Sequence, residues 1–501
     1  MAKPEYETHE HDVIVIGAGG AGLRAAIEAA AQGVSVGLIC KSLLGKAHTV
    51  MAEGGIAASL GNVWPEDNWQ VHFRDTMRGG KMLNNWRMAQ LHAQEAPERV
   101  LELERWGALF DRTKDGRILQ RDFGGHRYAR LAHVGDRTGL EMIRTLQYHG
   151  IHQGIDVYME CKVERLLKDG ERFMFNYIPE FFKGETADNI DEAERWYADK
   201  KNNRRTPDLL PRDEVARAIN SEVKARRGSP HGGVFLDIFS RRSPDYIRKR
   251  LPSMYHQFKE LANVDITKEP MEVGPTCHYV MGGVRVEADS TAATVQGLFA
   301  AGEVAGGMHG SNRLGGNSLS DLLVFGRRAG MYAALYAKNF GGQLVADSGQ
   351  VEVIARTMLE PFNRSGGENP YAIQADLQET MQTLVGIIRN EAELKEALKR
   401  IEVLKERAKK VRVEGGRVYN PGWHVALDLA SLLTVAECSA LAALERKESR
   451  GGHTRDDHPY ADDTWGKLNV VLRLRDGRVQ VAREPLPEMP AELRTLFQER
   501  K

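Results

Sequence analysis

Residues 12–33 read DVIVIGAGGAGLRAAIEAAAQG, and this stretch decides the fold. The apolar, β-branched run at 13–16 is typical of a buried parallel strand. Residues 23–31 are strong helix formers, and Gly33 ends that helix before a second apolar run at 34–40. The order strand, helix, strand predicts a βαβ unit at the start of an α/β domain.

The glycines between the first strand and the helix form a G-x-G-x-x-G pattern at Gly17, Gly19 and Gly22, with Gly20 inside it. Glycines here let the chain turn tightly and let the backbone approach a pyrophosphate at the helix N-terminus. Alone the pattern is weak, but it stands after a predicted strand and before a predicted helix, as the function requires. We therefore predict a dinucleotide site rather than a structural glycine turn.

Composition excludes several classes of protein. The chain has 501 residues, which favours roughly two to four domains. Lys+Arg and Asp+Glu are equal at 69 each, so no net charge favours nucleic acid or anionic lipid. The cysteines, which are Cys40, Cys161, Cys277 and Cys438, are far apart and contain no C-x-x-C, so we expect no iron–sulfur or zinc site in this chain and a reducing compartment.

Membrane and export signals are not expected. Residues 1–12 are polar and acidic, without the apolar core of an export signal. No apolar run approaches the roughly 20 residues that a membrane span needs. Farther along, apolar residues recur at helical spacing over 377–404 and again over 425–446, which predicts a helical domain. The last fifty residues are polar, with one strand-like run at 468–474.

The string KSLLGKAHTVMAEGGI at 41–56 closely resembles the segment by which flavoprotein subunits of succinate dehydrogenase and fumarate reductase hold FAD. In that family the histidine before threonine is bonded covalently to the flavin ring, and the matching residue is His48. A loop histidine bonded to backbone is the alternative interpretation. The resemblance implies a covalent FAD at His48, with further FAD contacts from Lys41, Ser42, Thr49, Gly54 and Gly55.

Two further strings resemble the substrate site of the same family. In GPTCHYVMGG at 274–283, the resemblance implies that His278 binds a substrate carboxylate; a capped histidine at a domain junction is the alternative. Residues 301–319 contain AGE and HGSNRLGGNSL. By resemblance Glu303 binds the FAD ribose, and Ser318 and Leu319 offer backbone groups to the flavin. Arg313 would clamp a substrate carboxylate, because a guanidinium fork matches a carboxylate with two hydrogen bonds.

The string LPRDEVAR at 210–217 resembles the segment that carries the proton-transferring arginine of the family, which is Arg212 here. Arginine is an unusual acid because its pKa is high, and it can serve only in a chain with carboxylates such as Asp213. By this resemblance Arg212, His278 and Arg313 are the catalytic residues. Flavin would take a hydride from succinate, or return it to fumarate.

The resemblance implies an α/β fold: a Rossmann-like FAD-binding domain in two chain segments, an inserted capping domain and a helical domain. The implied boundaries are 10–170 and 276–345 for the FAD domain, 171–275 for the cap, 350–450 for the helices and 451–501 for a tail. The implied partners are an iron–sulfur subunit and, through it, a membrane anchor or cytochrome b subunit. The protein would work in electron transport and the tricarboxylic acid cycle, cytoplasmic and peripheral on the inner face of the cell membrane, without nucleic acid.

A middle segment that the family normally has is absent between residues 170 and 171. It would carry an ATGG strand end, a GDG, an HPT and an EGxRG loop, and none of these strings occurs in the sequence. Either the gene or its product has lost the segment, or this is a divergent flavoprotein. Losing several co-acting groups usually lowers rate by orders of magnitude. The alternatives are therefore a catalytically impaired scaffold, or a relative such as L-aspartate oxidase, against which the covalent histidine argues.

Overall fold

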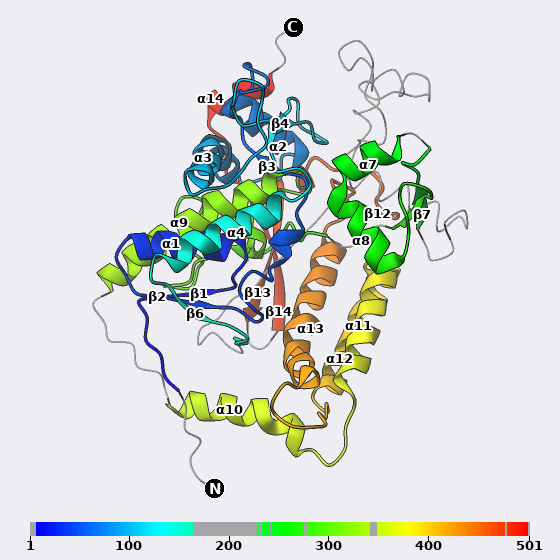
Figure 1. Cartoon of the computed structure of the whole chain (residues 1–501). Coiled ribbons are helices and arrows are strands. Elements are labelled where there is room, and N and C mark those ends of the chain that lie inside the picture. Colours follow the sequence, from blue (N-terminus) through cyan, green and yellow to red (C-terminus); the bar gives the residue numbers. More distant parts are fainter. Residues whose placement is uncertain are drawn as a thin grey trace.

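The computed structural model describes residues 7–163, 229, 233–240, 242–274, 278–340, 348–475 and 478–498. Figure 1 shows a small parallel sheet beneath several helices, with a bundle of long helices standing beside it. A smaller unit of helices and strands lies above the bundle, and the two described ends of the chain lie on opposite sides of the molecule.

The first residues fold as the predicted strand–helix–strand unit. Its members are β1 (Val13–Ile16), α1 (Gly20–Ala31), β2 (Val36–Ile39) and a third strand, β6 (Asp156–Tyr158). The strands are parallel in the order β1-β2-β6, with Val13 opposite Val36 and Ile16 opposite Ile39. A Cβ on Gly22 would lie 1.8 Å from the carbonyl oxygen of Gly17, so this turn requires glycine.

A distant part of the chain completes this domain. Helix α9 (Asn317–Asn339) lies along α1, as Figure 1 shows, and the two helices approach at glycines. A Cβ on Gly326 would be 2.6 Å from the Ala21 carbonyl oxygen. Leu323 is fully buried in the cluster that α1 also lines. The expectation of one α/β domain built from two chain segments is thus confirmed.

One face and one edge of the sheet are open. Ile14 and Ile16 of β1 are 55 % and 48 % exposed, although parallel strands are normally buried on both faces. Among the described residues, β1 pairs only with β2. The apolar run around Phe299 forms an isolated bridge to Ala292 and does not join the sheet in the described structure. One layer of the usual architecture is therefore not supplied by the described residues.

Short strands and three helices surround the start of α9. The strands form an antiparallel sheet in the order β3-β5-β4. The longest of the three helices, α3 (Trp86–Arg105), is capped by Asn85, whose side chain accepts from two backbone N–H groups. The elements are β3 (Ile56–Ala57), α2 (Trp69–Gly79), α3 (Trp86–Arg105), β4 (Gln120–Arg121), β5 (Leu131–Ala132) and α4 (Thr138–Ile151).

The capping unit is described in part, and its elements are β7 (Val234–Leu236), α7 (Pro244–Arg250), α8 (Pro252–Ala262) and β8 (Met271–Val273). Strands β7 and β8 are antiparallel. Ile247, Ile266 and Met271 form a small separate core. Ser253 donates its backbone N–H to Asp136 (2.9 Å), so α8 is tied to the FAD-type domain.

The predicted helical domain is confirmed. It contains α10 (Ser348–Asn363), α11 (Pro370–Leu384), α12 (Glu391–Ala408) and α13 (Pro421–Glu445). The expectation that no apolar segment reaches membrane length was wrong, because α13 is long and apolar enough by length and composition. It packs as a core helix, however: Leu429 and Leu433 lie in the bundle core, and Asp428 pairs with Lys41.

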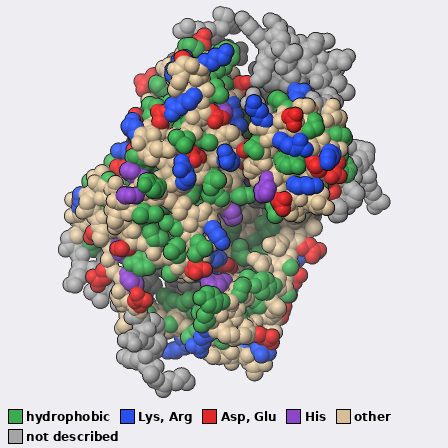
Figure 2. Space-filling view, in the orientation of Figure 1, with side chains coloured by type: hydrophobic (Ala, Val, Ile, Leu, Met, Phe, Trp, Pro, Cys, Tyr) green, Lys and Arg blue, Asp and Glu red, His purple; other side chains and the backbone are tan. Residues whose placement is uncertain are grey.

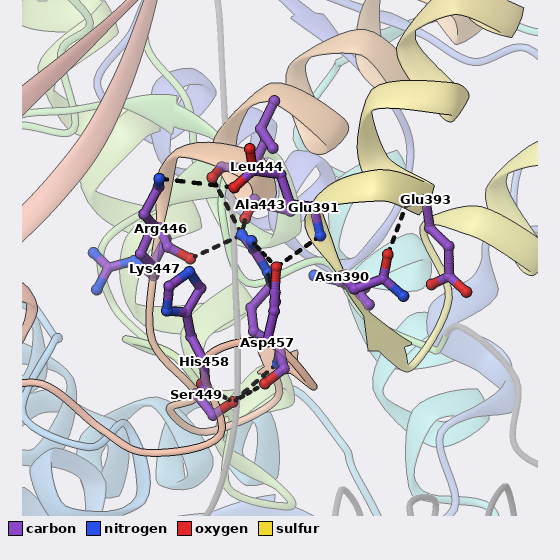
Figure 3. Close-up of polar contacts among 12 residues, drawn as sticks. Asn390, Glu391, Glu393, Ala443, Leu444, Arg446, Lys447, Ser449, Asp457 and His458 are labelled. Carbon is purple, nitrogen blue, oxygen red and sulfur yellow. Dashed lines mark hydrogen bonds and ion pairs between the residues drawn. The ribbon is translucent and has the colours of Figure 1, made fainter.

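The tail returns to the body of the protein. Figure 3 shows Asp457 of the tail beside Glu391 at the start of α12, and Glu391 donates its backbone N–H to that carboxylate (2.8 Å). Arg455, which is fully buried, donates to Asp457 and to the Ala443 carbonyl at the end of α13. The strand expected at 468–474 has a partner, so the tail forms a hairpin. These elements are β13 (Leu468–Arg475), β14 (Arg478–Pro485) and α14 (Ala491–Arg494).

Candidate functional site

The glycine loop after β1 lies against the short helix η1 (His48–Met51). Gly20 donates its N–H to the hydroxyl of Thr49 (3.3 Å), and Gly17 has a φ of +101°, which favours glycine. The side chain of His48 is exposed beside this loop. The predicted residues brought together here are Gly17, Gly19, Gly20, Gly22, His48 and Thr49.

Lys41 and Ser42 lie at the carboxyl end of β2, and both are exposed. The carboxyl edge of a parallel sheet is where such folds bind ligands. Lys41 points toward the helical domain, since its Nζ is 2.6 Å from the carboxylate of Asp428. The Ser42 carbonyl accepts a hydrogen bond from the Glu160 N–H (3.3 Å).

The segment with Gly54 and Gly55 runs beside the start of α9. The Ala57 N–H donates to the Gly316 carbonyl (3.2 Å), which joins these distant parts of the chain. Gly55 has a φ of +114°, and a Cβ there would be 2.9 Å from a backbone oxygen. The Arg121 guanidinium donates to the Gly54 carbonyl (2.9 Å) and fixes this loop.

The first turn of α9 offers free backbone donors. Gly316 precedes the helix with a φ of +80°, and no side chain caps it. Within the described residues, the N–H groups of Ser318 and Leu319 have no acceptor. Such groups at a helix N-terminus favour an anion or a carbonyl oxygen of a ligand.

Arg313 stands at this turn. Its Nη1 donates to the Ser318 hydroxyl (3.1 Å), and its guanidinium carbon lies 4.6 Å from the ring centre of Tyr279. The Tyr279 hydroxyl in turn lies 3.2 Å from His309 and 3.4 Å from Asp321. Burial and the nearby Asp321 carboxylate raise the Tyr279 pKa well above its usual value, so the hydroxyl keeps its proton. The ring and the hydrogen bonds fix the guanidinium in one place.

His278 directly precedes Tyr279 and is exposed, so the structure brings the two predicted carboxylate-binding residues, His278 and Arg313, to the same part of the molecule. Glu303 lies in the short helix η4 (Gly302–Val304), and its carboxylate accepts from the Val280 N–H (2.9 Å). Figure 2 shows a hollow in the face of the molecule that is in view, with hydrophobic and histidine side chains near it.

Arg212, the predicted proton-transfer residue, lies outside the described residues. The part of the cap that is described contacts the site through α8. Gln257 lies 3.4 Å from the Glu53 carboxylate, and burial together with Asp136 raises the pKa of Glu53. Sequence reasoning named neither Gln257 nor the support of Tyr279 by His309, although His309 stands inside the HGSNRLGGNS string.

The residues present fit FAD. The glycine turn admits a pyrophosphate. The N-terminus of α9, which no side chain caps, offers free N–H groups to a ligand. An exposed imidazole, His48, lies beside the glycine turn, next to Thr49, which accepts from the Gly20 N–H. Close to the glycine turn, the face of β1 with Ile14 and Ile16 is left exposed by the described residues.

Known families match nearly the whole chain. The FAD binding domain family matches residues 12–175 and 166–319, and the fumarate reductase flavoprotein C-terminal family matches residues 374–499. The chain is 36 % identical to a fumarate reductase (CoM/CoB) subunit of Methanothermobacter marburgensis, covering 93 % of this chain and 98 % of that one. It is 32 % identical to the succinate dehydrogenase flavoprotein subunit of Coxiella burnetii, covering 94 % and 95 %.

Two solved structures are also similar to nearly the whole chain. Mycobacterium smegmatis Sdh1 in complex with UQ1 has a TM-score of 0.85 at 50 % identity, covering 98 % of this chain and 97 % of that chain. A quinol–fumarate reductase with menaquinol molecules has a TM-score of 0.84 at 28 % identity, covering 97 % of this chain and 99 % of that chain.

The comparisons also locate a gap. The alignment with the Methanothermobacter protein spans 547 positions. This chain has only 501 residues, and 93 % of its residues lie in the alignment. Positions of that relative are therefore unmatched here. The FAD binding domain family matches in two pieces that meet at 166–175, which is where the sequence lacks the expected segment.

Proposed function

Because this chain belongs to the family of succinate dehydrogenase and fumarate reductase flavoprotein subunits, an FAD-binding family of oxidoreductases, we propose that it interconverts succinate and fumarate with FAD attached covalently to His48. The observation that carries the proposal is the position of Arg313. Its guanidinium is fixed over Tyr279 and bonded to Ser318, at the uncapped first turn of α9. A fixed cation beside free N–H groups suits a small dianion next to a flavin ring.

The residues divide the work as follows. Arg313 and His278 hold one carboxylate of the diacid, and this fixes the C–C bond that reacts. The N–H groups of Ser318 and Leu319 bind the flavin, which supplies hydride acceptance when it is bound. Glu303 and the glycine loop hold the nucleotide part. Arg212 moves the proton, and since it lies outside the described residues this role rests on the motif alone.

Covalent attachment at His48 is supported by exposure and by neighbours. The imidazole is exposed beside the glycine loop, and the next residue, Thr49, already accepts from the Gly20 N–H. A flavin whose pyrophosphate sits on the glycine loop would therefore have a ligand-accessible imidazole nearby.

Electrons must leave the site through other chains. The cysteines are scattered, which suits an iron–sulfur protein as the immediate partner. A membrane anchor or cytochrome b subunit would hold the complex on the cytoplasmic face of the membrane. The names of two similar proteins include a bound quinone or quinol, which supports quinone as the electron partner.

A catalytically impaired scaffold is the second candidate, and the open face of β1 favours it. Ile14 and Ile16 are half exposed where a covering layer is expected, and the HPT and EGxRG strings are absent. Such a chain would bind FAD or the iron–sulfur partner without turnover. A third candidate, an L-aspartate oxidase-like enzyme, would use aspartate and oxygen.

One set of assays separates the three. The purified chain is given succinate with an artificial electron acceptor, fumarate with reduced viologen, and aspartate with oxygen. We expect activity with the first two that an Arg313→Gln variant lacks, because the diacid loses its fixed cation. Retained flavin without turnover would replace the proposal with the scaffold, and peroxide formed from aspartate would replace it with the oxidase.

A further inference from the structure

Four histidines from separate parts of the chain surround residues 315–321, at the start of α9. Each directs its Nε2 toward an oxygen of this segment. The pairs are His126 with the Gly315 carbonyl (2.7 Å), His72 with Asn317 Oδ1 (3.0 Å), His92 with Ser320 Oγ (2.8 Å) and His309 with Asp321 Oδ2 (3.4 Å). We call these four side chains the histidine row.

The histidine row is buried. His72 and His92 are 0 % exposed, and their rings meet edge to face with centres 5.1 Å apart. His126 lies 5.9 Å from His72 in the same manner. Buried imidazoles need partners for their N–H groups, and all four find them on the same seven-residue stretch.

The partners determine which nitrogen carries the proton. A carbonyl can only accept, so His126 donates from Nε2 to Gly315. The Ser320 hydroxyl lies 3.3 Å from the Gly316 carbonyl and donates to it, so its oxygen accepts from His92. Asn317 uses its NH₂ group for the Thr76 hydroxyl (3.0 Å), which leaves Oδ1 for His72.

The other ring nitrogen supports the same assignment. Nδ1 of His72, His92 and His309 is buried and has no partner among the described residues, so a second N–H there would be unsatisfied. Burial accordingly lowers the His72 pKa well below its usual value and the His92 pKa to about 3. His72 and His92 are therefore neutral imidazoles that donate toward α9.

This arrangement changes what the helix terminus can do. The side-chain oxygens of asparagine, serine and aspartate can accept hydrogen bonds from nearby backbone N–H groups at a helix start. In α9 the oxygens of Asn317, Ser320 and Asp321 face the histidine row, while Ser318 accepts from Arg313. The N-cap residue is Gly316, which has no side chain, and none of these neighbouring oxygens caps the first turn in its place.

We propose that His72, His92, His126 and His309 are positioning residues that hold the acceptor groups of residues 315–321 away from the first turn of α9 and so keep the Ser318 and Leu319 N–H groups free for the flavin. The role rests on the proposed function, because it matters to chemistry only if a flavin binds there. Free N–H groups at a helix start favour negative charge, which a flavin gains on reduction. The histidine row thus raises the flavin's affinity for electrons.

The first test needs no cofactor and measures amide hydrogen exchange at single residues of the full chain. His72→Phe keeps the ring volume but removes the donor to Asn317. We expect exchange at Leu319 to slow at least about tenfold, because the freed Asn317 oxygen can accept from an N–H two residues on. His72→Gln, which restores a donor, should recover the original rate.

The matched control is His149→Phe, because His149 is a half-buried histidine stacked on Trp106 (4.0 Å) away from α9. It should leave exchange at 317–321 unchanged. Faster exchange along all of α9 in His72→Phe would show that His72 only stabilises the packing of the helix. Unchanged exchange would show that His72 does not keep the Asn317 oxygen away from the Leu319 N–H. Either result overturns the proposal.

The second test measures the flavin midpoint potential in the chain as purified with FAD. We expect His72→Phe to lower the equilibrium constant for two-electron reduction about tenfold, which corresponds to about 30 mV more negative. His72→Gln should restore the potential, and His149→Phe should match the parent. If the purified chain contains no FAD, the proposed function is contradicted but the role of the histidine row is not. The exchange experiment tests that role without a cofactor.

Discussion

The two faces of the β1 sheet differ sharply. On the helix side, Leu23 of α1 and Leu323 of α9 are buried in one hydrophobic core. On the other side Ile14 and Ile16 are about half exposed, in a strand whose alternate residue Val13 is 7 % exposed. The helix side carries the glycine loop and the start of α9. We call the helix side the packed half of the predicted FAD site; on the opposite side the described residues leave β1 exposed.

The largest effect should come from Gly22, on the packed side. Gly22→Ala places a Cβ 1.8 Å from a backbone oxygen, and the βαβ turn cannot relax around it. We expect a loss of at least about 3 kcal/mol in the free energy of unfolding, measured by urea denaturation. Gly19→Ala is the control, because its nearest neighbour is a side-chain oxygen at 3.6 Å. Equal stability losses in both variants would contradict the account.

The next effect concerns the contact of α9 with α1. Leu323 is fully buried in the shared core, so Leu323→Ala should lower the free energy of unfolding by about 2–5 kcal/mol. Thermal or urea unfolding measures this loss. A loss below about 1 kcal/mol would mean that α9 is not packed on α1 in solution, and the packed half of the site would not exist.

A third, smaller effect depends on pH. The His92 pKa falls from 6.5 to about 3, chiefly by burial and then by the nearby His309. Between these values the unfolded state binds more protons than the folded state, so stability falls as pH drops below 6.5. At pH 5 the loss is about 2 kcal/mol relative to pH 8.

The measurement compares His92→Gln with the parent at each pH, because other groups also titrate. His126 and Arg130 also face His92, and the Asp67 pKa, raised by burial to about 6, acts with the opposite sign. The difference between the two proteins should shrink as pH falls from about 8 to about 5. A difference that does not change with pH would show that His92 is not held neutral.

The smallest effect is expected on the open face. Ile14→Thr combined with Ile16→Thr should change the free energy of unfolding by no more than about 0.5 kcal/mol, since these side chains lose little contact. A loss of about 2 kcal/mol or more would show that something covers this face in solution. Urea unfolding measures it, with Leu323→Ala as the reference for a covered site.

Sequence patterns predicted the parts whose signal is local. The alternation of strand, glycines and helix at 12–33 located β1 and α1, and the helical spacing in 377–404 located α11 and α12. Both depend on neighbours in sequence. The strongly apolar character of α13 was missed because Asp428 and Glu437 interrupt the apolar run in sequence, although each has an ion-pair partner in the fold.

The supports of the site could not be predicted in the same way. His72, His92 and His126 are isolated in sequence, and only tertiary contact reveals that they converge on one helix terminus. The stacking of Arg313 on Tyr279 joins residues 34 positions apart in the printed sequence, with no periodic pattern between them. The resemblance named Arg313, but the physical reason for its fixed position came from the structure.

The most direct test of the account is whether the helix side of the cradle suffices to attach FAD. The purified chain is denatured in acid, digested with trypsin, and the peptide of residues 47–74, which contains His48, is weighed by mass spectrometry. We predict that this peptide carries FAD and that a His48→Ser variant does not. An unmodified peptide from a chain grown with ample flavin would contradict the account, because it would show that the open side of β1 is indispensable for attachment.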